Sequence, residues 1–321
     1  MSALHKKFPG VEVGGSSSMK SSNIGGQAVM EGVMMRNADK YAVAVRKTDG
    51  EIVVKTEEYK GIVQNKKIRF LPIIRGVFSF IDSMVLGMST LTYSASFFMD
   101  EEEEEKDEKK ESVMMGLTIA CSVVMAVAIF MILPYFLSQL FRKFTDSTTL
   151  ITLLEGAVRL VIFFGYILLI SRMKDIQRVF MYHGAEHKCI NCIEHGMELN
   201  VENVLKSSRL HKRCGTSFLF IVMIVSIIFF LFIRIESPIW RVVFRLLLIP
   251  VIAGVSFEFI RLAGKSENKL VIFLSKPGMM LQKLTTREPD ASMAEVAIAS
   301  VEAVFDWRAY LKENFGWQEK V

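Results

Sequence analysis

Four long apolar stretches dominate the hydrophobic pattern, and they comprise residues 114–140, 150–171, 217–233 and 242–260. Each reaches or approaches the roughly 20 residues that a helix needs to cross a hydrocarbon core. The pattern therefore predicts four transmembrane helices. Within the second stretch, Glu155 and Arg159 stand four residues apart, so we expect them to neutralise one another inside the helix bundle. Hydrophobic residues form 51% of the chain, which is more than a typical soluble enzyme contains.

A fifth segment, residues 71–99, is long and apolar but diluted by serine, threonine and glycine. As a fifth span it would move the lysine-rich N-terminal region to the side opposite the other basic segments, against the positive-inside rule. We therefore predict a helix that lies in the membrane interface or re-enters the same side. Its small residues, Gly76 and Gly87 among them, would alternatively allow tight packing on the bundle.

The polar regions predict the remaining organisation. Short alternating runs between residues 24 and 70 are typical of strands, and Asp49–Gly50 is a hairpin signal. After the last span we expect an interfacial helix broken near Pro277 and a second helix that begins at Pro289 and Asp290. The predicted fold is mainly α, and in chain order it contains a disordered N-terminus (1–22), a small cytosolic β unit (23–70), the interfacial or re-entrant helix (71–99), an acidic linker (100–112), a four-helix membrane domain (113–261) with a cytosolic loop (172–216), and C-terminal cytosolic helices (262–321).

The basic residues predict the orientation of these segments. Lysines and arginines concentrate in residues 172–215 and in the region after Arg261. Four spans place both regions and the N-terminus on one side, and the positive-inside rule assigns that side to the cytoplasm. No apolar signal-peptide core is visible at the N-terminus. We expect the lipid bilayer as a partner, and the modest net charge of +5 gives no reason to infer a nucleic acid.

Candidate chemistry is concentrated in one window, because seven of the nine histidines and cysteines lie between His183 and Cys214. Imidazole and thiolate are the side chains that hold transition metals. His183 and His187 stand at i and i+4, so on a helix both rings can reach one ion, and Glu186 lies beside them as a candidate general base. The local choices for a third ligand are Glu194, His195, His211 and Cys214.

Two other interpretations of the window stay open. Cys189 and Cys192 could join His211 and Cys214 in a closed Cys₃His zinc knuckle, which stabilises a loop and catalyses nothing. Alternatively, the histidines hydrogen-bond to carboxylates and the cysteines are incidental. A cytoplasmic location favours thiols or thiolate ligands over disulfides.

Five motifs, in this order along residues 23–300, resemble the YqhQ-like family of bacterial membrane proteins of unknown function, whose members are described as predicted metal-dependent enzymes. They are GGQAVMEGVMMR at 25–36, RG at 75–76 with DSMVLGMSTLTYSA at 82–95, HGAEHK at 183–188, HKRCGTSF at 211–218 and TTREPD at 285–290. Asp82 departs from the family pattern, which has glutamate there. The resemblance implies a mixed site rather than a knuckle, and its matching residues are His183, Glu186, His187, Glu194, His211 and Cys214.

These observations lead to two functional hypotheses. The first is a metal-dependent hydrolase at the cytoplasmic face of the bacterial inner membrane, holding Zn²⁺ or another divalent transition metal. Its metal ligands are His183, His187, His211 and Cys214, with Glu186 and Glu194 as the catalytic candidates. The second is a non-enzymatic membrane-protein biogenesis factor that binds other membrane proteins or a translocation channel, and whose His/Cys cluster only braces a loop. Its methionine-rich segment at 71–99 would contact apolar helices.

Overall fold

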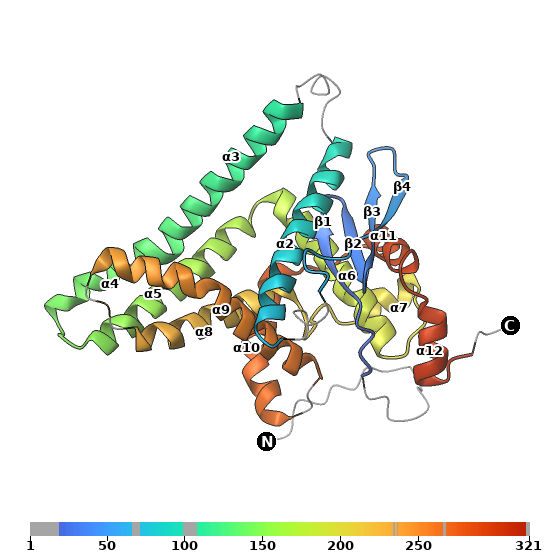
Figure 1. Cartoon of the computed structure of the whole chain (residues 1–321). Coiled ribbons are helices and arrows are strands. Elements are labelled where there is room, and N and C mark those ends of the chain that lie inside the picture. Colours follow the sequence, from blue (N-terminus) through green and yellow to red (C-terminus); the bar gives the residue numbers. More distant parts are fainter. Residues whose placement is uncertain are drawn as a thin grey trace.

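A small sheet is followed along the chain by a series of helices in the computed structural model, which describes residues 19–65, 71–98, 108–233, 235, 237–265 and 268–318 (Figure 1). The strands are β1 (Gly25–Val29), β2 (Gly32–Asn37), β3 (Lys40–Arg46) and β4 (Ile52–Glu58). The α-helices are α2 (Ile74–Ala95), α3 (Glu108–Val127), α4 (Leu133–Gln139), α5 (Thr148–Ile170), α6 (Lys174–Glu194), α7 (Val201–Lys206), α8 (Gly215–Phe232), α9 (Pro238–Lys265), α10 (Lys269–Thr285), α11 (Ala291–Glu302) and α12 (Trp307–Phe315).

The sheet is an antiparallel meander in the order β1-β2-β3-β4. The predicted hairpin at Asp49–Gly50 is confirmed: Gly50 adopts φ +90° between β3 and β4, and its N–H donates to the carbonyl of Lys47. The first predicted strand run is divided into β1 and β2, because Met30 and Glu31 form a turn between them. The predicted β unit therefore contains four paired strands.

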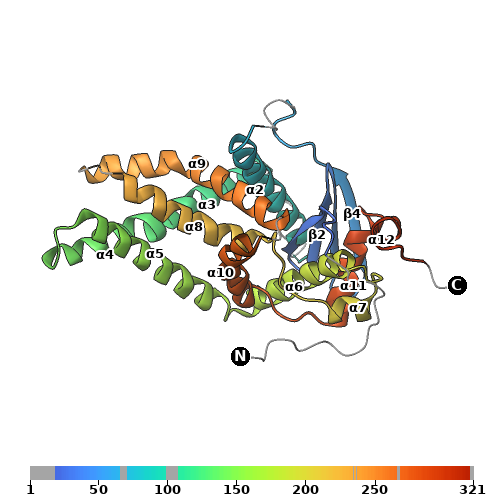
Figure 2. The same ribbon diagram turned by 90° about the horizontal axis from the view of Figure 1, so that it is seen from below.

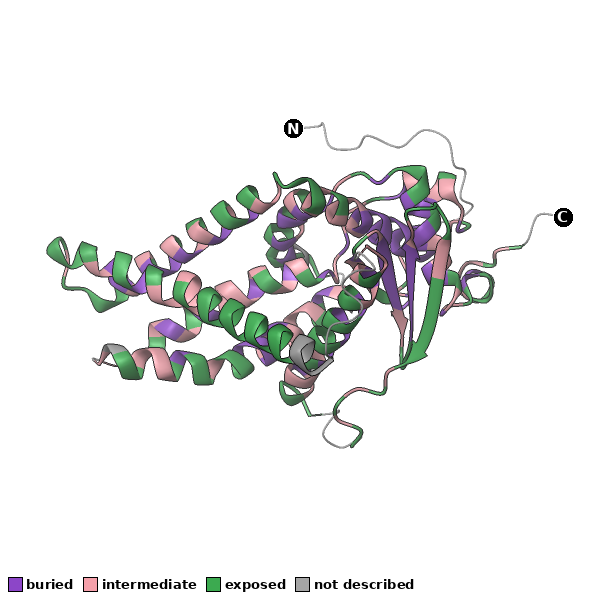
Figure 3. Cartoon of the chain, turned by 90° about the horizontal axis from the view of Figure 1, so that it is seen from above, coloured by how far each residue is buried: buried purple, intermediate pink, exposed green. Residues whose placement is uncertain are grey.

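Helices cover both faces of this sheet. Alternate residues of a strand point to opposite faces. On one face, Val33 and Ala44 pack with residues of α6 and α11, and on the other face Val43 and Val45 pack with Leu86 of α2. Buried residues are concentrated where the sheet meets these helices (Figure 3). The sheet thus fixes the relative positions of α2 and α6, which lie far apart in the sequence.

Several segments outside the sheet differ from expectation. Lys20 and Ser22, expected within the disordered N-terminus, contact the end of α6, whereas residues 1–18 lie outside the described residues. Most of the acidic linker also lies outside them, and Glu108 already belongs to α3. Helix α10 continues through Pro277 instead of breaking there. The C-terminal helix begins as predicted, with Asp290 capping α11, but a second cap at Asp306 starts α12.

Five helical segments among the described residues are long and apolar enough to cross a membrane: Ile74–Phe98, Val113–Lys143, Thr148–Ile170, Gly215–Phe232 and Ile239–Gly264. The last four correspond to the four predicted spans. The segment Thr148–Ile170 is α5. Figure 2 shows α5, α8 and α9 extending in one direction from the sheet, with α6 leading from the end of α5 to the sheet. The chain is therefore a mostly helical protein compatible with a membrane location.

Buried ion pairs and a hydrogen bond connect three of these long helices. The expected pair of Glu155 and Arg159 is confirmed at 3.0 Å. Arg245 of α9 also donates to both carboxylate oxygens of Glu155, and Arg159 donates to the hydroxyl of Ser226 on α8 at 3.1 Å. Removing one partner from a buried pair costs about 3–5 kcal/mol, so these contacts hold α5, α8 and α9 in a fixed arrangement.

Helix α2 crosses the ends of this group of helices rather than running alongside them (Figures 1 and 2). Its N-terminal part meets α9 where two glycines allow close approach: a Cβ on Gly76 would lie 2.9 Å from the Cα of Gly254. Its later part follows the sheet, where Ser94 accepts the N–H of Met30 at 3.1 Å. Helix α2 therefore links the sheet to the membrane-compatible helices.

Candidate metal centre

Helix α6 presents His183, Glu186 and His187 from one region of its surface. Residues three and four apart lie on the same face of a helix, and the rings of His183 and His187 have centroids 4.4 Å apart. Glu186 and His187 are buried. The HxxEH pattern (His183 to His187) therefore lies on a helix within the region expected as a cytosolic loop (172–216), and it lies inside the protein rather than on a solvated surface.

Cys214 reaches this face from the start of another helix. It is the N-cap of α8, and its Sγ lies 3.3 Å from Nε2 of His183. His183, His187 and Cys214 each offer one potential ligand atom, and these three atoms lie within 4.8 Å of one another. Zinc–nitrogen bonds of about 2.0 Å and zinc–sulfur bonds of about 2.3 Å place tetrahedral ligands roughly 3.3–3.7 Å apart. A small inward movement would thus let these three side chains hold one ion.

The hydrogen bonds of the two rings fit a metal site. Nδ1 of His183 donates to the carbonyl of Thr285 at 2.9 Å, and Nδ1 of His187 donates to the carbonyl of Arg209 at 2.6 Å. A ring that donates through Nδ1 keeps the lone pair of Nε2 for a ligand bond, and metal-binding histidines are usually oriented in this way. The residues present therefore fit zinc in both donor type and orientation.

The protonation states of Cys214 and His183 depend on one another. Burial raises the pKa of the Cys214 thiol, but the charges and hydrogen bonds of His183 and His187 outweigh burial and leave that pKa well below its ordinary value. Burial lowers the pKa of His183, yet the facing Cys214 raises it to about 9. The pair therefore tends towards thiolate and imidazolium, and a metal would bind the thiolate and displace the proton from the ring.

Glu186 is a separate carboxyl group in the same cavity. Burial raises its pKa, whereas the nearby histidines and the N–H of Gly26 on β1 lower it. The net result is a raised pKa. A carboxyl group whose pKa is moved towards neutrality is suited to proton transfer, whereas one at an ordinary pKa is a weaker base.

The group faces an apolar cleft of about 710 Å³. The cleft lies between β1, α2, α6 and the ends of α8 and α9. His183, Glu186 and Cys214 line it together with mostly apolar side chains, including Phe80, Met84, Met88, Leu91, Phe218 and Leu219. The polar group therefore forms part of the wall of a space that an apolar ligand could enter.

Two predicted site residues, Glu194 and His211, form a neighbouring pair instead of joining the three-residue group. Nε2 of His211 lies 3.3 Å from Glu194, whose other oxygen accepts from Ser22 and from Arg213 at 2.6 Å. Burial raises the pKa of Glu194, but His211 and Arg213 outweigh it and bring the pKa to about 2. This ionised carboxylate holds the residue that precedes Cys214.

The arrangement also bears on the zinc-knuckle alternative. Cys189 and Cys192 are fully buried in the core between the sheet, α6 and α11. Burial raises the pKa of Cys192 to about 12, and its thiol faces the carbonyl of Glu198 at 3.3 Å. Neither cysteine belongs to the group of potential ligands found among the described residues. They pack as small apolar residues, so the geometry does not favour a Cys₃His site.

Sequence reasoning missed the groups that orient the ligands. The carbonyls of Thr285 and Arg209 and the N–H of Gly26 belong to the backbone, so no side-chain pattern identifies them. The TTREPD and GGQAVMEGVMMR motifs were the available signals, because they contain Thr285 and Gly26.

Comparison with known proteins gives the family. The model of a family described as "Protein of unknown function (DUF1385)" matches residues 71–307. The chain belongs to this family. It is also 36% identical over 301 residues to "Uncharacterized protein YqhQ" of Bacillus subtilis (strain 168), covering 90% of this chain and 94% of that protein. No solved structure matches it. The DUF1385 match contains all the ligand candidates, and neither description assigns a function.

The first prediction concerns metal content. We expect about one zinc ion per chain after purification in detergent without chelators. His187→Ala removes a ligand and should lose most of the zinc, whereas Cys192→Ser alters only the core and should retain it. Inductively coupled plasma mass spectrometry of the three proteins measures the difference. Zinc that stays in His187→Ala, or leaves in Cys192→Ser, would contradict the three-residue site.

A second prediction tests the backbone that orients the ligands. A Cβ on Gly184 would lie 2.0 Å from the carbonyl oxygen of Arg287, so Gly184→Ala must displace the segment that contains Thr285. Because His183 donates to Thr285, the zinc affinity should fall about 10–100-fold although every ligand remains. Chelator competition measures the affinity. Gly165→Ala is the matched control, since a Cβ there meets no atom within 4 Å, and an equal loss in both variants would contradict this role.

Proposed function

We propose that this protein is a metal-dependent hydrolase that acts at the cytoplasmic face of the membrane. The observation that carries the proposal is a three-ligand group of His183, His187 and Cys214 beside the buried carboxyl of Glu186. Catalytic zinc sites usually have three protein ligands and an open fourth position, whereas structural sites have four protein ligands. The cleft in front of the group supplies the space for a substrate.

The roles of the residues follow from their positions. Zinc supplies Lewis acidity that polarises a carbonyl or phosphoryl oxygen and activates water at neutral pH. Glu186 accepts a proton at its carboxylate and returns it to the leaving group, a role that its raised pKa favours. The apolar walls exclude bulk water and thereby strengthen electrostatic interactions. Glu194 acts as a positioning residue through His211 and Arg213, and not as a second base.

The same proposal assigns four spans and places α2 at the membrane surface. Its support is the packing of Leu86 of α2 on the sheet, together with Asp82, which accepts from Tyr59 at 3.1 Å and from the N–H of Ile62 at 2.8 Å in the segment after β4. The sheet has an exposed edge strand with charged residues such as Lys55 and Glu58, and open sheet edges do not occur in hydrocarbon. A helix packed along that sheet therefore stays outside the hydrocarbon core. The basic segments assign the sheet and the metal group to the cytoplasm.

The orientation is tested with a membrane-impermeant thiol reagent on intact cells. Asp49 lies in the exposed β3–β4 turn, and Asp146 lies in the exposed connection between α4 and α5. We expect Asp146→Cys to be labelled in intact cells and Asp49→Cys to be labelled only after lysis. The unsubstituted chain, with its four native cysteines, gives the background. Labelling of Asp49→Cys in intact cells would overturn the cytoplasmic assignment.

Glu186→Gln tests catalysis. It removes the proton acceptor but no ligand, so the zinc content should stay unchanged and hydrolysis should fall about 10²–10⁴-fold. Hydrolysis can be followed without knowing the substrate, by incubating the purified protein with a total membrane extract in H₂¹⁸O. Mass spectrometry then detects products that gain ¹⁸O. Glu202→Gln, an exposed glutamate paired with Lys206, is the matched control. Equal ¹⁸O incorporation by Glu186→Gln and the unsubstituted protein would contradict a catalytic role.

A second candidate function is a non-enzymatic membrane-protein biogenesis factor, with a membrane protein or a translocation channel as its partner. The observation that favours it is the exposed apolar surface of α2, where the fractional exposure of Met84 is 59% and that of Met88 is 44%. Methionine surfaces adapt to varied apolar partners. A stoichiometric partner that co-purifies with Glu186→Gln, together with no ¹⁸O incorporation by any variant, would favour this function over hydrolysis.

A further inference from the structure

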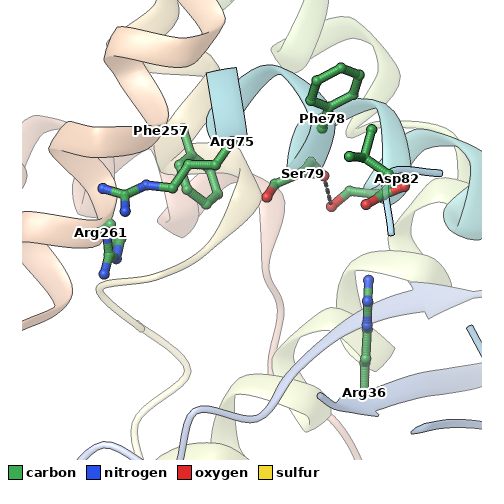
Figure 4. A pocket seen from close by; sticks show the side chains of 9 residues that line it. Arg36, Arg75, Phe78, Ser79, Asp82, Phe257 and Arg261 are labelled. Carbon is green, nitrogen blue, oxygen red and sulfur yellow. Dashed lines mark hydrogen bonds between the residues drawn. The ribbon is translucent and has the colours of Figure 1, made fainter. Parts of the chain in front are cut away.

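A second cavity, of about 370 Å³, lies next to the apolar cleft and differs from it in charge. Three arginines from three different elements line it: Arg36 from β2, Arg75 from the start of α2 and Arg261 from the end of α9 (Figure 4). Ser79 adds a hydroxyl group, whereas the hydroxyl of Ser83 donates to the carbonyl of Ser79 at 2.8 Å. Guanidinium and hydroxyl groups around a small cavity are the donors that recognise a phosphate.

The charges in this arginine cavity are not balanced. Glu258 pairs with Arg75 through two hydrogen bonds and lies 3.8 Å from Arg261. Asp82, the acid in the cavity lining, accepts from Tyr59 and Ile62. Arg36 donates through Nε to the carbonyl of Ala38 and its guanidinium lies 5.3 Å from the centroid of the Tyr59 ring, but it pairs with no carboxylate among the described residues. Three cations thus face two acids, which leaves one positive charge for an anionic ligand.

The two cavities adjoin along α2. Ser79, Ser83 and Phe257 line both of them. A molecule with a phosphate among the arginines could therefore extend an apolar part past Phe257 into the cleft beside Phe80 and Met84. Arg261 lies near the end of α9, a candidate membrane span, and Arg75 lies at the start of α2, which the proposed function places at the membrane surface. Basic cavities between helices at the cytoplasmic side of a membrane are typical sites for lipid headgroups.

We propose that the arginine cavity binds the phosphate of a phospholipid whose acyl chains occupy the adjoining cleft. This inference deepens the proposed function and rests on it only in naming the substrate class: a phosphate-bearing lipid presented to the metal group from the membrane surface. Arg36 is the specificity residue, because its guanidinium has no carboxylate partner among the described residues. The guanidinium of Arg261 supplies a second group that can donate to the phosphate.

The test compares three probes on the full-length protein in detergent by native mass spectrometry. Dioctanoyl phosphatidic acid contains phosphate and chains, dioctanoylglycerol contains only the chains, and glycerol 3-phosphate contains only the phosphate. Dioctanoyl phosphatidic acid should bind most tightly. Arg36→Ala should weaken it at least about tenfold, as expected for loss of a charge-assisted hydrogen bond, and should leave dioctanoylglycerol unchanged. Arg36→Lys, which keeps the charge but not the paired donors, should be intermediate.

Matched variants separate this inference from general charge effects and from the proposed hydrolase. Arg308→Ala removes an arginine on α12, away from both cavities, and should bind like the unsubstituted protein. Arg261→Ala should repeat the loss if Arg36→Ala fails to fold, as judged by its melting temperature. His187→Ala should lose zinc and keep the lipid, so failure of the metal site does not imitate failure of the lipid site.

Three results would overturn the inference. Equal binding of dioctanoylglycerol and dioctanoyl phosphatidic acid would show that the phosphate is not recognised. Equal losses in Arg36→Ala and Arg308→Ala would show that only surface charge matters. Binding of glycerol 3-phosphate as tightly as dioctanoyl phosphatidic acid would assign the cavity to a soluble phosphate compound instead of a lipid.

Discussion

The structure around the candidate metal centre depends on one constraint. Helix α6 buries many polar side chains, and each of them needs a hydrogen-bond partner. A buried polar group without a hydrogen bond costs about 1–3 kcal/mol. The end of α7 and the segment that follows it meet this need by running along α6, where their carbonyls accept from Lys188, Asn191 and His187. The accepting residues are Leu205, Ser207, Ser208, Arg209 and Leu210. The side chains of α6 thus determine the path of this segment, which ends at Cys214 opposite His183.

The atoms left over from these hydrogen bonds form the candidate centre. Nδ1 of each histidine is used by a carbonyl, so Nε2 of His183 and Nε2 of His187 face the sulfur of Cys214. Glu194, by contrast, accepts four hydrogen bonds at its carboxylate, two from Ser22, one from Arg213 and one from His211. A fully bonded carboxylate braces the fold, whereas the thiolate of Cys214 and the ring nitrogen of His183 share a proton that a metal ion can replace. This difference separates the positioning residues from the ligands.

The sequence predicted the parts of the site that depend on helical spacing. His183, Glu186 and His187 could be placed on one face because they lie within a single helix. Cys214 was one of four local choices, and the choice depended on the path of a connection with no periodic pattern. The four long apolar helices and the Asp49–Gly50 hairpin were predictable for the same local reasons. A helix within 71–99 was predictable too, but its position was not, because that position is decided by packing on a sheet that is distant in the chain. Arg245 was missed because pairs between separate helices leave no spacing signal.

The candidate centre lies at the joint between the two parts of the molecule. His183 and Glu186 come from a helix packed on the sheet, whereas Cys214 caps a helix that is apolar enough to span a membrane. The hydrogen bond from Arg159 to Ser226 holds α8 against α5, and Arg213, just before the N-cap of α8, pairs with Glu194. A small shift of α8 relative to α6 would therefore separate Cys214 from the histidines before it disturbed either core. Because the surrounding wall is mostly apolar, charges in the group interact more strongly than they would in water, so its chemistry depends directly on how firmly these two helices are joined.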